Sequence, residues 1–422
     1  MLRWRLALLI SAAIAISYLD RQTLPVAIKA IEHDIPITNE QFSSLQSAFL
    51  IAYAVMYAGG GKLMDVVGTR AGLLAIMVFW SLACASHGLA TSVGMLAVSR
   101  LLLGMGEGGG FPAATRAVAE WFPIHERSTA MGIINAGTAL GGVAAPPLLA
   151  LVITHADWRA VFYLTALVGL AWAVWWWFAY YPPDRHPRLS DEERQLLAPV
   201  IGAGRSAEPA PPWLTLLQYR ETWGLVTAKF LSDAAWYFYL FWLPKYLYDA
   251  RAFDIKAVGA FAWIPYAAAG VGCLVGGWLS SYLLTRNLPL DRARKIALGL
   301  SAVVMPAVWL VPSAPVGWAL AIFSLAYFGQ QSWSTLVMIL PADLYPRNAV
   351  GAVAGMVGFG GAMGGVVFGE IVGHLLDGGF GYGVVFAIAG SLHVIAFGII
   401  CLAIPKVRPV AVPLTVPVPR PA

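Results

Sequence analysis

The feature that most constrains this chain is the recurrence of long apolar runs along its 422 residues. Each run has roughly 18 to 25 residues, enough for a helix to cross about 30 Å of hydrocarbon. Hydrophobic residues make up 59% of the chain and charged residues only 12%, so the expected solvent is a bilayer rather than water. A transmembrane β-barrel would instead show alternating segments of about ten residues, which this sequence lacks. The chain is therefore predicted to be an all-α polytopic membrane protein.

The apolar runs predict about twelve transmembrane helices in two bundles. Their ranges are 5–29, 42–64, 72–90, 94–117, 128–153, 158–180, 222–248, 257–284, 294–312, 315–340, 348–374 and 381–404. This predicts an N-terminal six-helix bundle over 1–180, a cytoplasmic linker over 181–221, a C-terminal six-helix bundle over 222–405 and a cytoplasmic tail over 406–422. In the linker, Ser190 and Glu193 have the spacing of a capping box, which predicts a short surface helix.

The distribution of positive charge predicts the orientation of the chain. Lys and Arg are concentrated in one set of connecting segments, whereas the other set carries only Lys29, Arg159, Lys245, Arg251 and Lys256. Because cytoplasmic segments are the richer in Lys and Arg, both termini are expected in the cytoplasm and the chain in the cell (inner) membrane. This asymmetry accounts for the net charge of +5, so no nucleic-acid partner is expected.

Several classes of protein do not fit the sequence. Cys84, Cys273 and Cys401 all fall within predicted helices, so neither a disulfide framework nor a cysteine metal cage is expected. No HExxH, GxSxG or phosphate-binding loop is present, which argues against an intramembrane enzyme or an ATPase. The basic, apolar N-terminus resembles a signal peptide but continues into further helix without a clean cleavage site. The chain is expected to use no cofactor.

The two predicted bundles are related by an internal repeat. Residues 119–142 align without gaps to residues 342–365, a constant offset of 223. The matching pairs are Pro123/Pro346, Gly132/Gly355, Gly137/Gly360, Gly141/Gly364 and Gly142/Gly365. Duplication of six helices, with a substrate site at the interface between the halves, is a transporter architecture.

A cytoplasmic loop motif strengthens this interpretation. The segment GKLMDVVGTR over 61–70 resembles the loop motif of the major facilitator superfamily, and its counterpart in the second half keeps Gly277 and Arg286 but lacks the aspartate. Further segments, among them YLDRQTL and SRLLLGMGEGGGFPAATRAVAEWFP, resemble the anion:cation symporter branch of that superfamily, and within it the bacterial hexuronate and galactonate carriers. The resemblance covers nearly the whole chain and implies the major facilitator fold.

In the first half, four ionisable residues lie well inside predicted helices, where a charge must be paired, hydrated or functional. Asp20 and Arg21 lie in the first helix, and Arg100 and Glu107 lie about two turns apart on one face of the fourth. One interpretation is a fixed ion-pair cluster between the two helices. The other is a binding site in which an anionic substrate gives the arginines a second partner, because guanidinium binds carboxylate in a bidentate way.

The resemblance favours a binding site. It assigns the substrate carboxylate to Arg21 and proton coupling to Asp20 and Glu107. The other matching positions near the substrate are Arg100, Tyr18 and Tyr53. At the offset of 223 the counterpart of Glu107 is Gln330, which cannot titrate, so coupling is expected in the first half.

In the second half, the positions expected to face the substrate are aromatic or neutral: Trp236, Tyr237, Gln330 and Ser334. Such side chains suit a polyhydroxylated ligand, although Trp and Tyr also gather at membrane interfaces. Lys229 and Asp233 lie four residues apart and are expected to form a local pair. By resemblance, Gly61, Asp65, Gly68 and Arg70 form a conformational latch on the cytoplasmic side.

The expected function is proton-coupled uptake of a small carboxylate, most simply a sugar acid, by alternating access in a monomer. A proton-driven exporter is the first alternative; against it, the prolines of the fifth predicted helix, Pro146 and Pro147, come later than in the antiporter motif. A non-transporting solute sensor is the second alternative.

Overall fold

The structure is a computed structural model that describes residues 1–123, 126–203 and 212–410. Its N-terminal half consists of α1 (Leu2–Asp34), α2 (Asn39–Val67), α3 (Thr69–Ser86), η1 (His87–Leu89), α4 (Val93–Glu107), α5 (Gly110–Trp121), α6 (Arg127–His155) and α7 (Arg159–Ala179). The connecting segment contains η2 (Pro183–Arg185), α8 (Asp191–Ala203) and α9 (Trp213–Leu216). The C-terminal half consists of α10 (Arg220–Arg251), α11 (Ile255–Phe261), α12 (Ile264–Thr285), α13 (Leu290–Val303), η3 (Met305–Ser313), α14 (Val316–Leu344), α15 (Arg347–Asp377) and α16 (Tyr382–Ala403).

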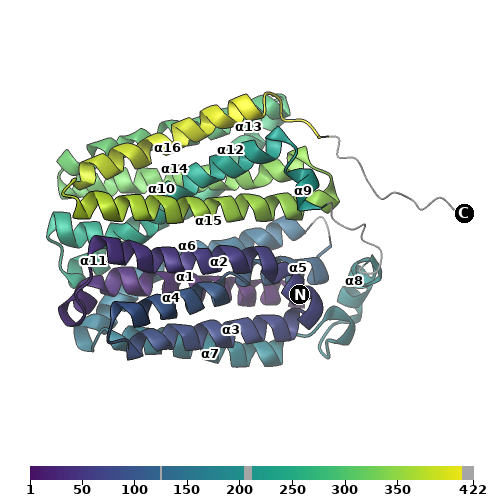
Figure 1. Cartoon of the computed structure of the whole chain (residues 1–422). Coiled ribbons are helices and arrows are strands. Elements are labelled where there is room, and N and C mark those ends of the chain that lie inside the picture. The colour runs from purple at the N-terminus through teal and green to yellow at the C-terminus, as the bar shows by residue number, and fades with distance from the viewer. Residues whose placement is uncertain (124–125, 204–211, 411–422) are drawn as a thin grey trace, which may run out of the picture.

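The two halves lie side by side as bundles of roughly aligned helices, with α1, α2 and α6 of one half facing α10, α11 and α15 of the other (Figure 1). We call the end of the two bundles at which α1 begins and α8 lies the near end (right in Figure 1), and the opposite end (left) the far end. Within the described residues, nine helical segments are long and apolar enough to cross a membrane. The pair α4 and α5, together with α10 and α14, completes the expected twelve; these are less apolar because they are broken or carry polar and aromatic side chains.

Three of the expected helices are interrupted. The range 94–117 is two helices, α4 and α5, separated by a turn at Gly108 and Gly109. The range 257–284 is α11 and α12, which break just before Pro265, and 294–312 is α13 followed by the 3-10 helix η3, in which Pro306 cannot donate a backbone hydrogen bond. In each case the α-helical hydrogen bonding is interrupted next to glycine or proline. The apolar run continues across the interruption, so hydropathy alone predicts one unbroken helix.

The internal repeat is visible in how the helices pack. A Cβ added at Gly141 of α6 would overlap the carbonyl oxygen of Ala15 in α1, and one added at Gly364 of α15 would overlap the carbonyl oxygen of Phe230 in α10. The glycines therefore let the two backbones of each pair approach closely. Because Gly141 and Gly364 are repeat partners, the α1–α6 crossing of the first half recurs as the α10–α15 crossing of the second.

The sequence-predicted surface helix of the linker is present as α8. The backbone N–H of Glu193 donates to Ser190 Oγ at 3.3 Å, as the capping box requires. The Glu193 carboxylate itself accepts from the backbone N–H of Leu2 at 3.0 Å and from Arg3 Nη1 at 2.9 Å. The linker is thereby attached to the start of α1 at the near end.

Candidate functional site

The four predicted charged residues of α1 and α4 come together in the N-terminal half. Asp20, Arg21, Arg100 and Glu107 are 1%, 2%, 0% and 2% exposed. Arg21 Nε forms an ion pair with Glu107 Oε2 at 2.7 Å, and Ser17 Oγ donates to the same oxygen at 2.7 Å. Because Ser17 precedes Arg21 by one helical turn, both side chains reach Glu107 from the same face of α1.

Three aromatic rings surround the Arg21 guanidinium. Its central carbon lies 4.6 Å from the ring centroid of Tyr53, 4.7 Å from that of Tyr18 and 5.5 Å from that of Phe49. A cation over an aromatic face is stabilised by the quadrupole of the ring. Within the described residues, no hydrogen bond or ion pair uses the two terminal nitrogens of Arg21, so the planar fork that binds carboxylates is free.

The pairing within this cluster is incomplete. Asp20 Oδ2, Glu107 Oε1 and Arg100 Nε and Nη1 are buried atoms without a hydrogen-bond partner among the described residues. Buried charged groups without partners are destabilising and rare in structures. A cluster built only to hold α1 against α4 would satisfy these atoms. Of the two interpretations, the geometry therefore favours a binding site, in which the charged groups exchange partners, rather than a fixed ion-pair cluster.

Arg100 and Glu107 share a face of α4, but the ion-pair partner of Glu107 in the described structure is Arg21. Arg100 Nη2 donates to the backbone carbonyl of Arg21 at 3.5 Å, and its guanidinium lies 5.7 Å from the ring centroid of Phe49. Arg100 therefore contacts α1 through the backbone of Arg21.

The glycine run of α4 positions Glu107 by close packing. A Cβ at Gly104 would overlap the carbonyl oxygen of Phe49, and one at Gly108 would lie 2.5 Å from the carbonyl oxygen of Tyr53, both in α2. Small residues at such crossings allow the helices to touch through their backbones. The aromatic rings of Phe49 and Tyr53 are thereby brought against the same cluster that contains Glu107.

The residues predicted in the second half divide into two groups. Trp236 packs edge-on against Tyr327 at 5.5 Å and Tyr237 stacks on Phe241 at 5.8 Å, so both also serve the aromatic core. Gln330 is 1% exposed.

Gln330 and Ser334 belong to a polar cluster. Gln330 Nε2 donates to Asp233 Oδ1 at 3.4 Å, and its Oε1 contacts His393 Nε2. Ser334 Oγ accepts from Lys229 Nζ at 2.7 Å. Of the four predicted residues, therefore, the two on α14 bind a buried Lys–Asp pair on α10.

The predicted latch is only partly described. Gly68 has φ +82° at the junction of α2 and α3, a left-handed conformation that favours glycine. Arg70 donates from Nη2 to the carbonyl oxygen of Trp177 at 2.7 Å and lies 3.7 Å from the ring centroid of Tyr181, so it ties α3 to the end of α7. Gly61 and Asp65 lie in α2, and the contacts of Gly61 and of the Asp65 side chain are outside the described part of the structure.

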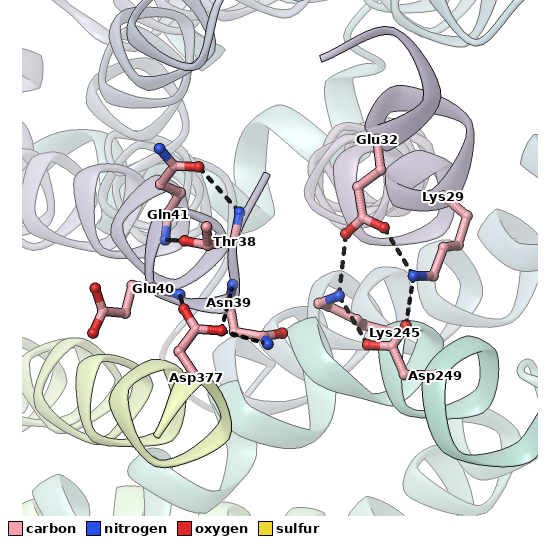
Figure 2. Close-up of polar contacts among 9 residues, drawn as sticks. All are labelled: Lys29, Glu32, Thr38, Asn39, Glu40, Gln41, Lys245, Asp249 and Asp377. Carbon is pink, nitrogen blue, oxygen red and sulfur yellow. Dashed lines mark hydrogen bonds and ion pairs between the residues drawn. The ribbon is translucent and has the colours of Figure 1, made fainter. Parts of the chain in front are cut away.

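At the far end a ring of four charges joins the two halves (Figure 2). Lys29 of α1 binds Glu32 at 2.8 Å and Asp249 of α10 at 2.6 Å. Lys245 of α10 binds the same two carboxylates, at 3.1 Å to Glu32 and 2.8 Å to Asp249. Each charge thus contacts one partner on its own helix and one on the other half.

A second far-end contact joins α15 to the first turn of α2 (Figure 2). Asp377 Oδ1 accepts from the backbone N–H of Asn39 at 3.1 Å and from its side-chain amide at 2.7 Å, and Oδ2 accepts from the N–H of Glu40 at 2.8 Å. A carboxylate at a helix N-terminus satisfies free backbone donors and complements the helix dipole. Here the carboxylate comes from the opposite half.

Several of these residues were not predicted from the sequence. Ser17 could have been predicted from the sequence, because it lies one helical turn before Arg21 and so on the same face of the helix. The far-end pairs Lys29–Asp249 and Glu32–Lys245, and the contact of Asp377 with α2, join residues more than 200 positions apart and leave no local pattern.

Comparisons with known proteins identify the family of the chain. The model of the Major Facilitator Superfamily matches residues 10–369. The chain is 30% identical over 393 residues to the hexuronate transporter of Escherichia coli (strain K12), covering 92% of this chain and 90% of that protein. It is 34% identical over 381 residues to a probable sulfoacetate transporter of Cupriavidus necator, covering 89% of this chain and 88% of the relative.

Among solved structures, the chain superposes on a bacterial homologue of the human lysosomal transporter Spinster in an inward-facing and occupied conformation. The TM-score is 0.73 at 16% identity, with 95% of this chain and 97% of the other covered. This agreement concerns the fold. The family model and the curated relatives describe transporters and not enzymes, and on that evidence the chain belongs to the Major Facilitator Superfamily.

Proposed function

We propose that this protein is a secondary transporter that takes up a small organic acid, most simply a sugar acid such as a hexuronate or aldonate, together with protons. The observation that carries the proposal is the state of Arg21: it is buried and paired through Nε with Glu107, and its two terminal nitrogens carry no hydrogen bond within the described residues. A carboxylate fits such a fork in a bidentate way. The named substrates of the two relatives, hexuronate and sulfoacetate, are both organic acids.

In this proposal the residues around Arg21 have distinct roles. The rings of Tyr18 and Tyr53 hold the guanidinium in place and present hydroxyls to the substrate. Trp236 and Tyr237 supply aromatic faces from the second half, and Gln330 and Ser334 supply polar groups. Arg100 supplies a second positive charge close to the backbone of Arg21.

Asp20 and Glu107 carry the coupling protons. Each has one carboxyl oxygen without a partner among the described residues, where a proton can be held. When Glu107 is ionised it neutralises the charge of Arg21 and repels the substrate carboxylate; when it is protonated, the full charge of Arg21 attracts that carboxylate. Binding of substrate and binding of a proton therefore support one another, which is the thermodynamic requirement for symport.

Alternating access follows from the two ends of the molecule. With the near end in the cytoplasm and the chain in the inner membrane, as the distribution of positive charge predicts, the far-end contacts close the external side. Opening to the outside then requires the four-charge ring and the Asp377 cap to separate. The motif containing Asp65 is proposed to act in the opposite sense, by stabilising closure of the cytoplasmic side.

Transport into proteoliposomes tests the proposal. Purified protein is reconstituted and offered labelled galacturonate, galactonate and an aromatic acid, each with and without an inward proton gradient. We expect accumulation of at least one sugar acid above its external concentration only with the gradient. Uptake that equilibrates but never accumulates would contradict proton coupling, and accumulation driven by an outward gradient would support the exporter instead.

A further inference from the structure

The C-terminal half contains a second buried cation that the proposed function does not use. Lys229 of α10 is 6% exposed and Asp233, one turn later, is 7% exposed. Lys229 Nζ binds Asp233 Oδ1 at 2.9 Å and Ser334 Oγ at 2.7 Å. An ammonium has three donors, so one donor remains for a further acceptor. Ionisable groups inside a membrane protein are rare and mark substrate or ion pathways.

The internal repeat places this pair at the interface between the halves. In the two matching helix crossings, Ala15 of α1 corresponds to Phe230 of α10. Residues 15 and 230 differ by 215, as do residues 18 and 233, so Asp233 occupies the position in α10 that Tyr18 occupies in α1. Tyr18 contacts Arg21. By the same pseudo-symmetry, Asp233 lies at the depth of Tyr18, and Lys229 corresponds to Ile14, about one turn closer to the near end.

Packing along α15 connects the pair to the N-terminal half. A Cβ added at Gly358 of α15 would lie 3.0 Å from the Tyr57 ring of α2, and one added at Gly365 would overlap the Tyr237 ring of α10 and lie 2.8 Å from Leu50 of α2. On α15, a Cβ at Gly361 would overlap the Asp233 carboxylate, so the glycine leaves room for the pair. The Lys229–Asp233 pair therefore lies on α10 against α15, the helix that also packs on α2 of the N-terminal half.

The charges of the site match a doubly charged ligand. Arg21, Arg100 and Lys229 carry three positive charges, and Asp20, Glu107 and Asp233 carry three negative ones. If both proposed coupling acids bind protons, the site has an excess of two positive charges. A dianion neutralises that excess, whereas a monoanion leaves one buried positive charge uncompensated.

We propose that Lys229 binds a second anionic group of the substrate, so that the substrate class is a short acid with an acidic group at each end, either a dicarboxylate or a sulfonated carboxylate. This inference rests on the proposed function, in which Arg21 holds the first carboxylate. Asp233 then acts toward Lys229 as Glu107 does toward Arg21: it is the partner of the cation until the ligand arrives.

Equilibrium binding to the purified protein tests the inference, with two six-carbon probes that differ at one end. Galactarate has a carboxylate at both ends, and galactonate has a carboxylate at one end and a hydroxyl at the other. We expect the wild type to bind galactarate more tightly. A hydrogen bond to a charged group contributes about 1.5–3 kcal/mol, and about 1.4 kcal/mol corresponds to a tenfold change in affinity. Lys229→Gln should therefore weaken galactarate binding roughly 10-fold to 150-fold. It should change galactonate binding by less than about 3-fold.

Two further variants guard against indirect effects. Lys229→Gln with Asp233→Asn removes both charges, so it avoids an unpaired buried carboxylate and should reproduce the selective loss. Lys295→Gln is the matched control, because Lys295 forms an equivalent pair with Asp291 four residues away, at 2.8 Å, on the near-end surface; it should bind both probes like the wild type.

The outcomes separate the two proposals. Wild type that binds galactonate as tightly as galactarate, or Lys229 variants that weaken both probes equally, overturn the second anion site and leave the first carboxylate site intact. Wild type that binds neither acid overturns the proposed function together with this inference.

Discussion

Replacement of Glu107 by glutamine is the sharpest test of the proposed coupling. The substitution keeps the shape of the side chain, so Ser17 and Arg21 still have an oxygen to which they can donate hydrogen bonds. It removes the charge, and Arg21, 2% exposed, becomes a buried cation without its ionic partner. Removing one partner of a buried pair typically destabilises a protein by about 3–5 kcal/mol. Because the hydrogen bonds remain, we expect the lower end of that range.

The same substitution should strengthen substrate binding. An anion bound at Arg21 restores the missing negative charge and is no longer repelled by Glu107. If about half of a 3 kcal/mol penalty is recovered on binding, affinity increases by roughly tenfold. The variant should therefore unfold at a lower temperature than wild type without substrate and show a larger stabilisation by substrate. It should also exchange labelled for unlabelled substrate across the membrane but fail to accumulate it, because it imitates the permanently protonated state.

The assays are thermal unfolding with and without galacturonate, and counterflow and proton-driven uptake in one vesicle preparation. Glu221→Gln is the control, since Glu221 pairs with Arg220 at the near end, away from the site; it should behave like wild type. Proton-driven accumulation that survives in Glu107→Gln would remove this residue from the mechanism. Weaker substrate binding in that variant would show that ionised Glu107 does not repel the substrate carboxylate.

Three further predictions follow from other contacts. Arg21→Lys keeps the charge but loses the planar fork, so substrate affinity should fall by about 2–3 kcal/mol, or 30-fold to 150-fold, in a titration, whereas unchanged affinity would contradict the carboxylate assignment. Asp377→Asn weakens the far-end cap, and because Asp377 is exposed the effect should be about 1 kcal/mol. Labelling of single cysteines on either side of the membrane should then show roughly fivefold more of the outward-open state relative to the inward-open state. An unchanged ratio of the two states would exclude the cap from gating. Burial alone would raise the pKa of Glu193, but hydrogen bonds from the backbone of Leu2 and Arg3 and from the Arg3 side chain lower it below its ordinary value of 4.5. Docking of α8 is thus fully stabilised above about pH 4.5 and weakens as the pH falls through the lowered pKa. The hydrogen-exchange protection of α8, taken relative to the intrinsic exchange rate at each pH, should therefore fall at low pH in wild type and already at pH 7 in Glu193→Gln; equal protection in both at pH 7 would contradict it.

Much of the fold could be predicted because its main determinants are local. A run of 20 apolar residues defines a spanning helix wherever it occurs, and glycines at a constant offset revealed the repeat before their packing was known. The breaks after Glu107, before Pro265 and at η3 were not predicted. At these places the sequence stays apolar, although the α-helical pattern of backbone hydrogen bonds is interrupted.

The candidate site was predicted in part for the same reason. A charge inside an apolar run is conspicuous in the sequence, so Asp20, Arg21, Arg100 and Glu107 could be identified as a group. Which of them pair could not, since the pairing depends on how far α1 and α4 approach each other across the glycines of α4.

By itself, the sequence determined that this chain spans a membrane as two related halves and that charges are buried in the first of them, because hydrophobic length and the cost of a buried charge act on each segment independently. Only the tertiary structure decided that Arg21 pairs with Glu107, that Lys229 donates to Ser334 of α14, and that Asp377 caps a helix more than 300 residues away. These contacts form only when two helices lie within a few ångströms of each other, and that separation is set by how the helices pack in the folded protein.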